Sequence, residues 1–281
     1  MIIWLASYPK SGNTWVRSFL SAYYHSSDGI FNFDLLNNIK QYPKREFFDQ
    51  KIDKPGEINN FWQSSQEKII SNKKINILKT HNALIKINNN AFTSTKYTLG
   101  VIYILRDPRN ILTSLTNHYQ MNYEEALAFM TNEKKYIYDN RLIDDVDYSD
   151  FHYLSSWSNH YKSWSKNNLF KKIIIKYEDL LEKPHLVFND LIVFINQLSQ
   201  INKNVDAQKF TNAINSTNFK SLQNLEKTKN FSEGIYSNKD KSKIKFFNLG
   251  VDNKWKKKIP KNMHDTINKT FKNVLQNLNY I

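Results

Sequence analysis

The sequence contains no cysteine among its 281 residues. This absence excludes a disulfide scaffold, thiolate metal sites, cysteine nucleophiles and cysteine-bound iron–sulfur clusters. Glycine and proline occur only 6 times each, which excludes collagen-like and proline-rich low-complexity architectures. Hydrophobic residues make up 40% of the chain and aromatic residues 14%. Such a content indicates a chain that folds around a core.

Long hydrophobic runs are also missing. The longest apolar stretches, such as residues 101–105 and 191–195, are far shorter than the roughly 20 residues that a helix needs to cross a bilayer. We therefore expect no transmembrane segment. The first residues form a short apolar run that leads straight into a motif, with no basic segment before it. This arrangement argues against a signal peptide, and we expect a cytoplasmic location.

Acidic residues are scarce relative to basic ones. The chain has 40 Lys and Arg against 26 Asp and Glu, which gives a formal net charge of +14. Residues 226–281 alone hold 13 Lys against 5 acidic residues. Such a surplus favours an anionic partner, and nucleic acid, an anionic membrane surface or a polyanionic small molecule would all fit. A lysine-rich surface that serves only solubility is the alternative explanation.

Apolar runs and helical patterns alternate along the chain. Strands are predicted at Ile2–Ala6, Ile75–Lys79, Tyr97–Leu105 and Lys172–Lys176. Helices are predicted at Thr14–Tyr24, from Pro108 to about Tyr119, at Phe151–Lys166, from Pro184 to about Leu198, at 203–226 and at 261–278. Residues 26–60 are interpreted as loops and short helices, 121–150 as an irregular acidic insert and 227–255 as a long loop. The alternation predicts an α/β fold with a central parallel sheet flanked by helices.

A polar motif, SYPKSGNT, separates the first predicted strand from the first predicted helix. A tight turn there directs successive backbone N–H groups at one spot, beside the positive end of the helix dipole. Gly12 allows close approach, Lys10 adds a full charge, and Ser11, Asn13 and Thr14 supply side-chain donors. The spacing differs from the G-x-x-x-x-G-K-[ST] loop of nucleoside triphosphate enzymes. The motif predicts phosphate binding, with a serine-rich helix cap as the alternative.

Two further predicted strands end in polar clusters. Lys79-Thr80-His81 follows the second strand, and Arg106-Asp107 follows the third, with Ser114 two helical turns later. Ligands of parallel sheets bind at the carboxyl ends of the strands, so these cations favour an anion site. The neutral imidazole of His81 could take a proton from a hydroxyl at neutral pH. A structural histidine and a structural ion pair between Arg106 and Asp107 are the alternatives.

Together these motifs resemble those of the sulfotransferases that use 3′-phosphoadenosine 5′-phosphosulfate (PAPS). The segment YPKSGNTW resembles their 5′-phosphosulfate loop, and LRDPRN with Ser114 resembles their 3′-phosphate motif. The resemblance implies a single α/β domain over residues 1–281, like the P-loop nucleotide kinases. It also implies transfer of a sulfuryl group from PAPS, by in-line attack, to a hydroxyl of a small, lipid or sugar acceptor. The product would be 3′,5′-adenosine bisphosphate (PAP), with no metal required and no nucleic acid as partner.

The resemblance also implies roles for particular residues. His81 would be the general base, with Lys10 and Lys79 acting on the leaving phosphate. The residues implied in cofactor binding are Ser11, Gly12, Asn13, Thr14, Trp15, Arg106, Ser114, Tyr177, Phe219, Asn248 and Gly250. Three further histidines, His118, His152 and His160, are expected on helices in structural or pocket roles.

The carboxyl-terminal part departs from the family pattern. The family's Arg-Lys-Gly is replaced by Asn248-Leu249-Gly250, which puts one 3′-phosphate contact in question. Asn248 could still donate a hydrogen bond, and Lys243 or Lys245 could supply charge. Residues 259–265 do not resemble the family's dimer motif, so no oligomeric state is predicted. Residues 26–62 and 120–150 are interpreted as acceptor-side inserts, and 227–255 as a loop that covers the cofactor.

Two other functions stay open at this stage. A P-loop kinase acting on a small molecule would need a glycine spacing and Mg²⁺-binding carboxylates that the sequence does not offer. A basic nucleic-acid-binding protein has the net charge as support, but no RNA-recognition, zinc-finger or helix-turn-helix signature. Residues 26–62, 82–96, 118–150 and 231–247 are expected to shape the acceptor site. They carry the aromatic residues Phe61, Trp62, Tyr119, Phe129, Phe231 and Tyr236. They favour an apolar or ring-bearing alcohol as acceptor.

Overall fold

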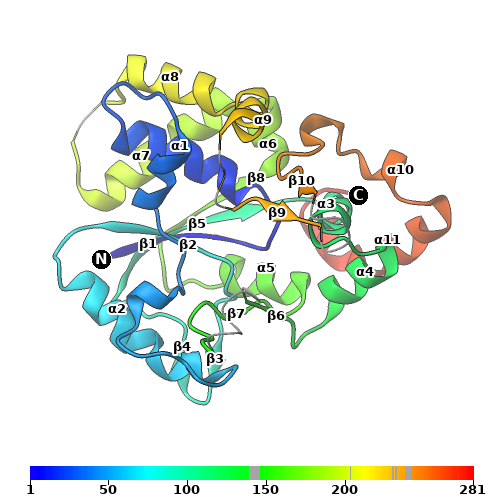
Figure 1. The fold of residues 1–281 in the computed structure, drawn as a ribbon, viewed down its shortest axis with the longest axis horizontal. Helices are drawn as coiled ribbons and strands as arrows, with labels where there is room; N and C mark the ends of the chain where they lie inside the picture. The colour runs from blue at the N-terminus through cyan, green and yellow to red at the C-terminus, as the bar shows by residue number, and fades with distance from the viewer. Residues whose placement is uncertain (139–145, 203, 230, 232, 238–241) are drawn as a thin grey trace.

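The computed structural model describes residues 1–138, 146–202, 204–229, 231, 233–237 and 242–281. At its centre, parallel strands form one sheet in the order β2-β1-β5-β8 (Figure 1). Their bounds are β1 Ile2–Ser7, β2 Asn76–Thr80, β5 Thr98–Leu105 and β8 Lys172–Lys176. This parallel sheet confirms the predicted fold class, and each strand lies within two residues of its predicted bounds.

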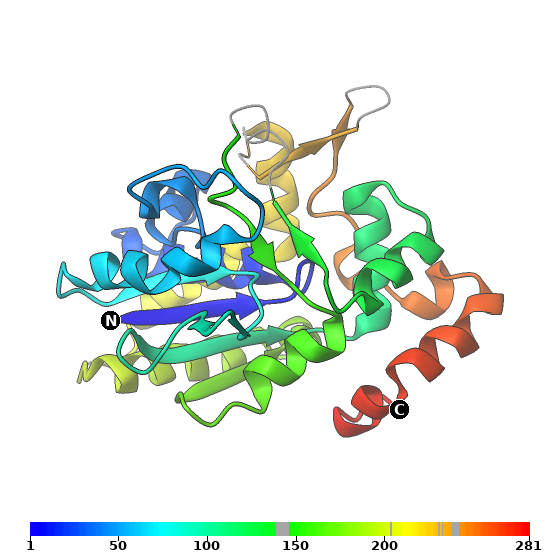
Figure 2. The ribbon, with the colours of Figure 1, turned by 90° about the horizontal axis from the view of Figure 1, so that it is seen from below.

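Helices cover both faces of the sheet (Figure 1). One face carries α1 Asn13–His25, α6 Tyr177–Glu182, α7 Pro184–Ser199, α8 Ala207–Thr217 and α9 Phe219–Thr228. The other face carries α2 Trp62–Ile70 and α5 Trp157–Ser165. Further helices gather toward the end at which the strands finish (Figure 2). These are α3 Pro108–Tyr119, α4 Tyr123–Thr131, α10 Trp255–Lys258 and α11 Lys261–Asn277.

Short elements make up the rest of the described chain. The 3-10 helices are η1 Phe33–Asn38, η2 Arg45–Phe47, η3 Glu57–Phe61 and η5 Gly250–Asp252. Antiparallel ribbons pair β3 Lys86–Ile87 with β4 Asn90–Ala91, β6 Tyr136–Ile137 with β7 His152–Tyr153, and β9 Ile235–Tyr236 with β10 Lys243–Ile244. Among the described residues, no helix combines the length and the apolar character needed to cross a membrane.

Side chains of the central strand β1 point alternately to the two faces of the sheet and join a hydrophobic cluster on each face. All six residues of β1 are buried, as expected for a strand covered on both faces of a parallel sheet. Ile2 and Trp4 pack into the cluster that includes aromatic side chains of α2 and α5. Ile3 and Leu5 pack into the cluster that includes residues of α1 and α7. The core thus holds β1 rigidly, and the turn that follows Ser7 projects from a fixed base.

The structure corrects some of the predicted elements. A continuous helix over residues 151–166 is wrong, because β7 occupies its start and Ser156 caps α5 by accepting from Asn159 N. His152 therefore lies on a strand and not on a helix. The segment 121–150 is not irregular throughout, since a capping box begins α4. The helical stretch 203–226 is two helices, divided at Asn218.

Parts of three predicted segments lie outside the described residues. They are 139–145 of the acceptor-side insert 120–150, residue 203 of the helical stretch, and residues 230, 232 and 238–241 of the segment 227–255. The described part of 227–255 is not only a loop, because it contains β9, β10 and η5.

Candidate active site

The turn between β1 and α1 lies at the carboxyl end of the central strand. Lys10 has a φ of 66° and Gly12 a φ of 103°, so both occupy the left-handed region that side chains such as lysine seldom adopt. Ser11 N donates to the Tyr8 carbonyl at 3.3 Å. A Cβ at Gly12 would lie 2.5 Å from the Tyr177 ring. The backbone is held in a tight and strained form, which is common at binding sites.

The polar side chains at the start of α1 have two roles. Asn13 Nδ2 donates to the Leu5 carbonyl and to Ser7 Oγ, both at 3.1 Å. This amide braces the turn and is not the free donor to phosphate that was predicted. The hydroxyl of Ser11 is buried and has no hydrogen-bond partner among the described residues. Gly12 begins the helix without a side-chain cap from the described residues. Trp15 N donates to the Gly12 carbonyl at 3.1 Å, which leaves the Asn13 and Thr14 amides for an anion.

Arg106 joins the two predicted phosphate motifs. Its Nη1 donates to the Lys10 carbonyl at 2.8 Å and to Ser114 Oγ at 3.2 Å. Its guanidinium lies over the Tyr177 ring, 4.1 Å from the ring centroid. Its Nε is buried and unpartnered within the described part of the chain. A guanidinium with a spare N–H beside a hydroxyl is well suited to binding phosphate oxygens.

Asp107 pairs with Arg109 and not with Arg106. The Asp107 carboxylate caps α3 by accepting from Arg109 N at 2.9 Å, and it accepts from the Arg109 guanidinium at 2.7 Å. Both side chains are buried. The alternative of an Arg106–Asp107 ion pair is therefore wrong, and Arg106 keeps its positive charge for another partner.

The ammonium of Lys10 makes direct contact with two uncharged side chains. Its Nζ is 3.3 Å from His118 Nδ1 and 3.9 Å from the centroid of the Phe246 ring. Burial and the neighbouring charge of Arg106 lower the pKa of Lys10 to about 7. Burial and Lys10 lower the pKa of His118 to about 2. The neutral imidazole can therefore accept from the ammonium. His118 lies on α3, as predicted. Its contact with Lys10 was not predicted.

Lys79 takes part in a charge cluster that the sequence analysis missed. Its Nζ donates to Glu233 Oε1 at 3.2 Å, and Arg17 Nη1 donates to the same oxygen. Thr14 Oγ1 donates to Glu233 Oε2 at 3.3 Å. Burial on its own would raise the pKa of Glu233, but Lys79 and Arg17 outweigh it and hold that pKa well below its usual range. The carboxylate is therefore charged, and Lys79 is not a free cation in this structure.

His81 follows β2 and is oriented by the turn after β1. Its Nδ1 lies 2.8 Å from the Ser7 carbonyl oxygen. A carbonyl only accepts hydrogen bonds, so Nδ1 carries the proton, and Nε2 of the neutral ring keeps its lone pair. Burial and the charge of Lys79 lower the pKa of His81 to about 3. The ring is thus neutral and presents one basic nitrogen.

The aromatic residues predicted to hold adenine fall into two contacts. Trp15 and Tyr177 meet edge to face, with ring centroids 5.8 Å apart, and Tyr177 also lies under the Arg106 guanidinium. Phe219 packs on Gly250, where a Cβ would lie 2.4 Å from the Phe219 ring. The indole Nε1 of Trp15 is buried and meets no partner in the described residues.

The carboxyl-terminal segment brings a different asparagine to Ser114. The Asn248 carbonyl accepts from Gln223 Nε2 at 3.0 Å, which holds this residue through its backbone. Asn253 Nδ2 donates to Ser114 Oγ at 3.0 Å. Lys243 Nζ donates to the Glu226 carbonyl, so its charge is turned toward α9. Asn253 was not predicted, and it is the residue of this segment that touches the Arg106–Ser114 pair.

Polar side chains from two distant segments lie beside His81. His152, in β7, has its ring centroid 6.1 Å from that of His81. Its Nε2 is 3.2 Å from the side-chain nitrogen of Gln41, which belongs to the segment 26–62. Its Nδ1 is buried and unpartnered among the described residues. Neither Gln41 nor this placement of His152 stands in a local pattern that would have indicated it.

Aromatic side chains of α3 and α4 form an apolar surface beside Tyr8 in the turn after β1. Tyr119 stacks on Phe129 at a centroid distance of 5.4 Å, and Phe129 meets Tyr8 edge to face at 6.5 Å. Trp62 and Phe231, which were predicted to shape an acceptor pocket, are buried in the two hydrophobic clusters, and Phe129 belongs to the same cluster as Trp62. Their packing stabilises the fold on this side of the site.

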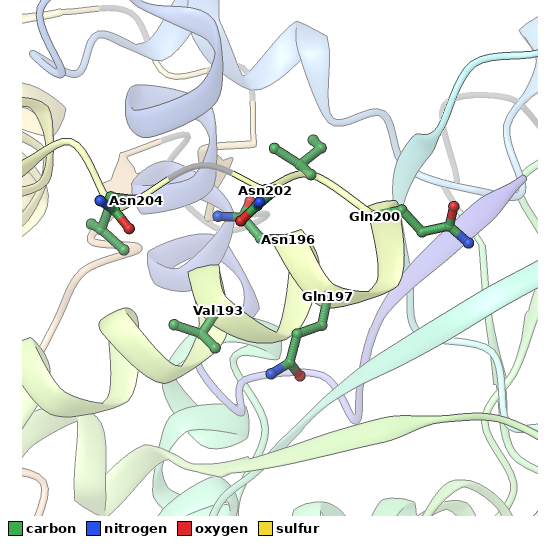
Figure 3. Close-up of a pocket in the computed structure, with 8 residues that line it drawn as sticks. Val193, Asn196, Gln197, Gln200, Asn202 and Asn204 are labelled. Carbon is green, nitrogen blue, oxygen red and sulfur yellow. The ribbon is translucent and has the colours of Figure 1, made fainter.

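A surface hollow of about 460 Å³ lies at the other end of the strands (Figure 3). The end of α7 and the residues after it form its walls, with amide side chains such as Asn196 and Gln197. Leu198 packs on Gly100, near the start of β5, which places this hollow far from His81. Within the described residues, no three His, Asp or Glu side chains gather as a metal site would require.

Sequence comparison matches residues 2–279 to the sulfotransferase domain family. Sulfotransferase 1B1 of the dog, Canis lupus familiaris, is 24% identical over 263 residues, which cover 90% of this chain and 76% of that relative. Sulfotransferase 1 family member D1 of Mus musculus is 22% identical over 264 residues, again 90% of this chain and 76% of that relative.

Solved structures share the fold at low sequence identity. Mouse sulfotransferase SULT7A1 complexed with PAP superposes with a TM-score of 0.60 and 16% identity, over 98% of this chain and 84% of that chain. Retinol dehydratase in complex with androsterone and the inactive cofactor PAP superposes with a TM-score of 0.61 and 15% identity, over 98% of this chain and 80% of that chain. The domain match extends over nearly the whole sequence. The chain therefore belongs to the sulfotransferase domain family, the enzymes that transfer a sulfuryl group from PAPS.

Proposed function

We propose that this chain moves a sulfuryl group from PAPS to a hydroxyl of a small acceptor, at the carboxyl ends of β1, β2 and β5. Two hydrogen bonds to one turn carry the proposal. Arg106 Nη1 donates to the Lys10 carbonyl, and His81 Nδ1 donates to the Ser7 carbonyl, both at 2.8 Å. They join the 3′-phosphate motif and the base to the phosphate loop. We also propose that residues 1–281 act as one domain.

Unpartnered groups at the turn fit a bound polyanion. The Ser11 hydroxyl and Arg106 Nε are buried and lack partners among the described residues, which costs free energy unless a ligand satisfies them. The 5′-phosphate would lie on Lys10, Ser11, Gly12 and Thr14 and the backbone N–H of Asn13. The 3′-phosphate would lie on Arg106 and Ser114, with Asn253 or Asn248 beside them. Adenine would lie against Trp15, Tyr177 and Phe219, with Gly250 leaving room.

PAPS supplies a sulfuryl group joined to a good leaving group, its 5′-phosphate. His81 Nε2 accepts the proton of the acceptor hydroxyl, and the Ser7 carbonyl stabilises the resulting imidazolium through Nδ1. Lys10 and Lys79 hold positive charge at the end of the turn, where negative charge grows as the phosphate departs. A bound polyanion raises the pKa of His81 above about 3 and that of Lys10 above about 7. Both shifts favour catalysis.

The acceptor that fits this site best is an apolar alcohol or phenol. The stacked rings of Tyr119 and Phe129 offer an apolar wall, and His152 with Gln41 offers polar atoms near His81. The relative retinol dehydratase has been solved with androsterone and with retinol, and both are apolar alcohols. Segments 26–62 and 120–150 would contribute to this side, and 227–255 would cover the cofactor.

The family match favours this function over the kinase and nucleic-acid alternatives. Both alternatives depended on features that the sequence shares with many proteins, a phosphate loop in one case and a positive charge in the other. The sulfotransferase function uses the loop, the 3′-phosphate motif and the histidine together.

The test is transfer of radioactive sulfur from labelled PAPS to a panel of phenols, sterols and retinoids. With the best acceptor, His81→Ala is expected to lower kcat by about 10²- to 10⁴-fold, the usual effect of losing a general base. The affinity for PAP should stay unchanged. His25→Ala is the matched control, because His25 is exposed at the end of α1. Full turnover by a folded His81→Ala protein would overturn the assignment of the base.

A further inference from the structure

A carboxylate from the segment 227–255 fills a position at the phosphate loop. Glu233, between α9 and β9, accepts hydrogen bonds from Thr14 Oγ1 at 3.3 Å, from Lys79 Nζ at 3.2 Å and from Arg17 Nη1. Thr14 belongs to the loop itself, and Lys79 lies two residues before His81. The acid therefore lies between the predicted 5′-phosphate site and the predicted base.

Arg17 is fixed for this contact by backbone groups. Its Nε donates to the Ile39 carbonyl at 2.6 Å and its Nη2 to the Leu36 carbonyl at 2.8 Å, which leaves Nη1 directed at Glu233. The side chains of Arg17 and Lys79 are only 7% and 6% exposed. Two buried cations that meet at one point repel each other and have lost their hydration, so the position between them requires an anion.

In the proposed reaction, the group that lies between the 5′-phosphate and the base is the one transferred. We propose that Arg17, Thr14 and Lys79 form the seat of the sulfuryl group, and that Glu233 occupies this seat until the donor displaces it. The existence of an anion seat rests on the contacts above. Its assignment to the sulfuryl group rests on the proposed function.

Displacement exchanges one anion for another. A sulfuryl group has three oxygens, enough to accept from all three donors, whereas the Glu233 carboxylate accepts from them with two. Glu233 is thus a built-in competitor, and the affinity of the wild-type protein for PAPS is lower than the seat alone would give. The same competition keeps small anions such as inorganic sulfate out of the seat while no donor is bound.

Calorimetric titration with inorganic sulfate tests the seat without any nucleotide. Glu233→Gln keeps the shape of the side chain and removes its charge, and we expect it to bind sulfate about tenfold more tightly than the wild type. Asp252→Asn is the matched control, because Asp252 is an exposed acid of the same segment. It should bind sulfate as the wild type does. Adding Arg17→Gln to Glu233→Gln should remove the gain.

The outcomes separate the seat from the function. The seat is contradicted if the wild type and a folded Glu233→Gln protein bind sulfate equally tightly. It is also contradicted if Asp252→Asn increases sulfate affinity as much as Glu233→Gln does. Glu233→Ala replaces Glu233→Gln if circular dichroism shows the latter unfolded.

Titration with PAPS and PAP tests the assignment to the sulfuryl group. Glu233→Gln should tighten the binding of PAPS more than that of PAP, because PAP lacks the sulfuryl group. Equal tightening overturns this assignment. If Glu233→Gln binds sulfate more tightly but the protein binds neither PAPS nor PAP, the anion seat is supported and the proposed function is contradicted.

Discussion

Buried positive charge is the main property of the individual site residues. Lys10 belongs to the turn between β1 and α1, and Arg106 donates to its carbonyl. Lys79 and Arg17 meet at Glu233, which also accepts from Thr14 at the start of α1. Glu233 balances Lys79 and Arg17, whereas the Lys10 ammonium meets the neutral His118 and the Phe246 ring and forms no ion pair with a described carboxylate. Uncompensated burial of a cation is costly. Binding of an anionic ligand relieves that cost, and this is the physical origin of the expected affinity.

The protonation of Lys10 should make PAP binding depend on pH. Because the pKa of Lys10 is lowered to about 7, its ammonium loses the proton as the pH rises above that value. We expect the affinity for PAP to fall by up to about tenfold per pH unit between about pH 7 and pH 8.5. Calorimetry over this range checks the expectation.

Lys10→Arg is the control for this pH dependence, because a guanidinium stays charged throughout the range. Its affinity for PAP should be flat where that of the wild type falls. Identical pH profiles for the two proteins would show that Lys10 does not control binding.

The sequence predicted those site residues that belong to continuous motifs. Lys10, Arg106 and His81 each follow a strand whose apolar run is easily recognised, and the structure brings them to one edge. Arg17 and Glu233 are 216 positions apart, and neither stands in a local pattern that differs from an ordinary helix or loop. Contacts of that range arise only from tertiary packing, so no local signal could have indicated them.

The decisive element is the turn from β1 into α1. Its backbone needs a positive φ at Gly12, and its closeness to the Tyr177 ring leaves no space for a Cβ. Asn13 ties the start of the helix back to β1. The turn is therefore preorganised before any ligand is bound.

Gly12→Ala should damage both stability and binding. An alanine in the left-handed region costs about 1–2 kcal/mol, and its Cβ would push Tyr177 away from the turn. We expect a loss of stability of this size or more in urea unfolding, and a loss of PAP affinity of at least about tenfold, which calorimetry measures.

Gly56→Ala is the matched comparison for this element. Gly56 also has a positive φ, of 91°, and a Cβ there would lie 2.8 Å from the Tyr153 hydroxyl. This change should cost similar stability but leave PAP affinity unchanged. A Gly12→Ala protein that kept wild-type affinity for PAP would contradict the role of the turn.

Elements with a strong and uniform pattern were predictable, and mixed segments were not. The apolar runs of β1 and β5 and the Pro-initiated helices α3 and α7 lie where the sequence placed them. The stretch 151–166 has aromatic residues throughout, so the short strand β7 was absorbed into the pattern of α5. A two-residue strand depends on its partner β6, which no local pattern encodes.

At the scale of the whole molecule, the order of the strands brings the positively charged motifs together at one edge of the sheet. Parallel strands in the order β2-β1-β5-β8 bring the residues that follow β1, β2 and β5 to one edge of the sheet, although they come from three distant parts of the chain. The net charge of +14 adds a long-range field that attracts polyanions. Both properties suit a nucleotide that carries phosphates on two of its positions.

The central claim is that this edge binds a 3′,5′-bisphosphate nucleotide. Calorimetric titration of the full chain with PAP in the absence of metal tests it most directly, with ATP and Mg²⁺ titrated in parallel. The account predicts a Kd for PAP in the micromolar range or lower, which is a binding free energy of about −8 kcal/mol or more negative. It predicts weaker binding of ATP. Failure to bind PAP, or tighter binding of ATP with Mg²⁺, would contradict it.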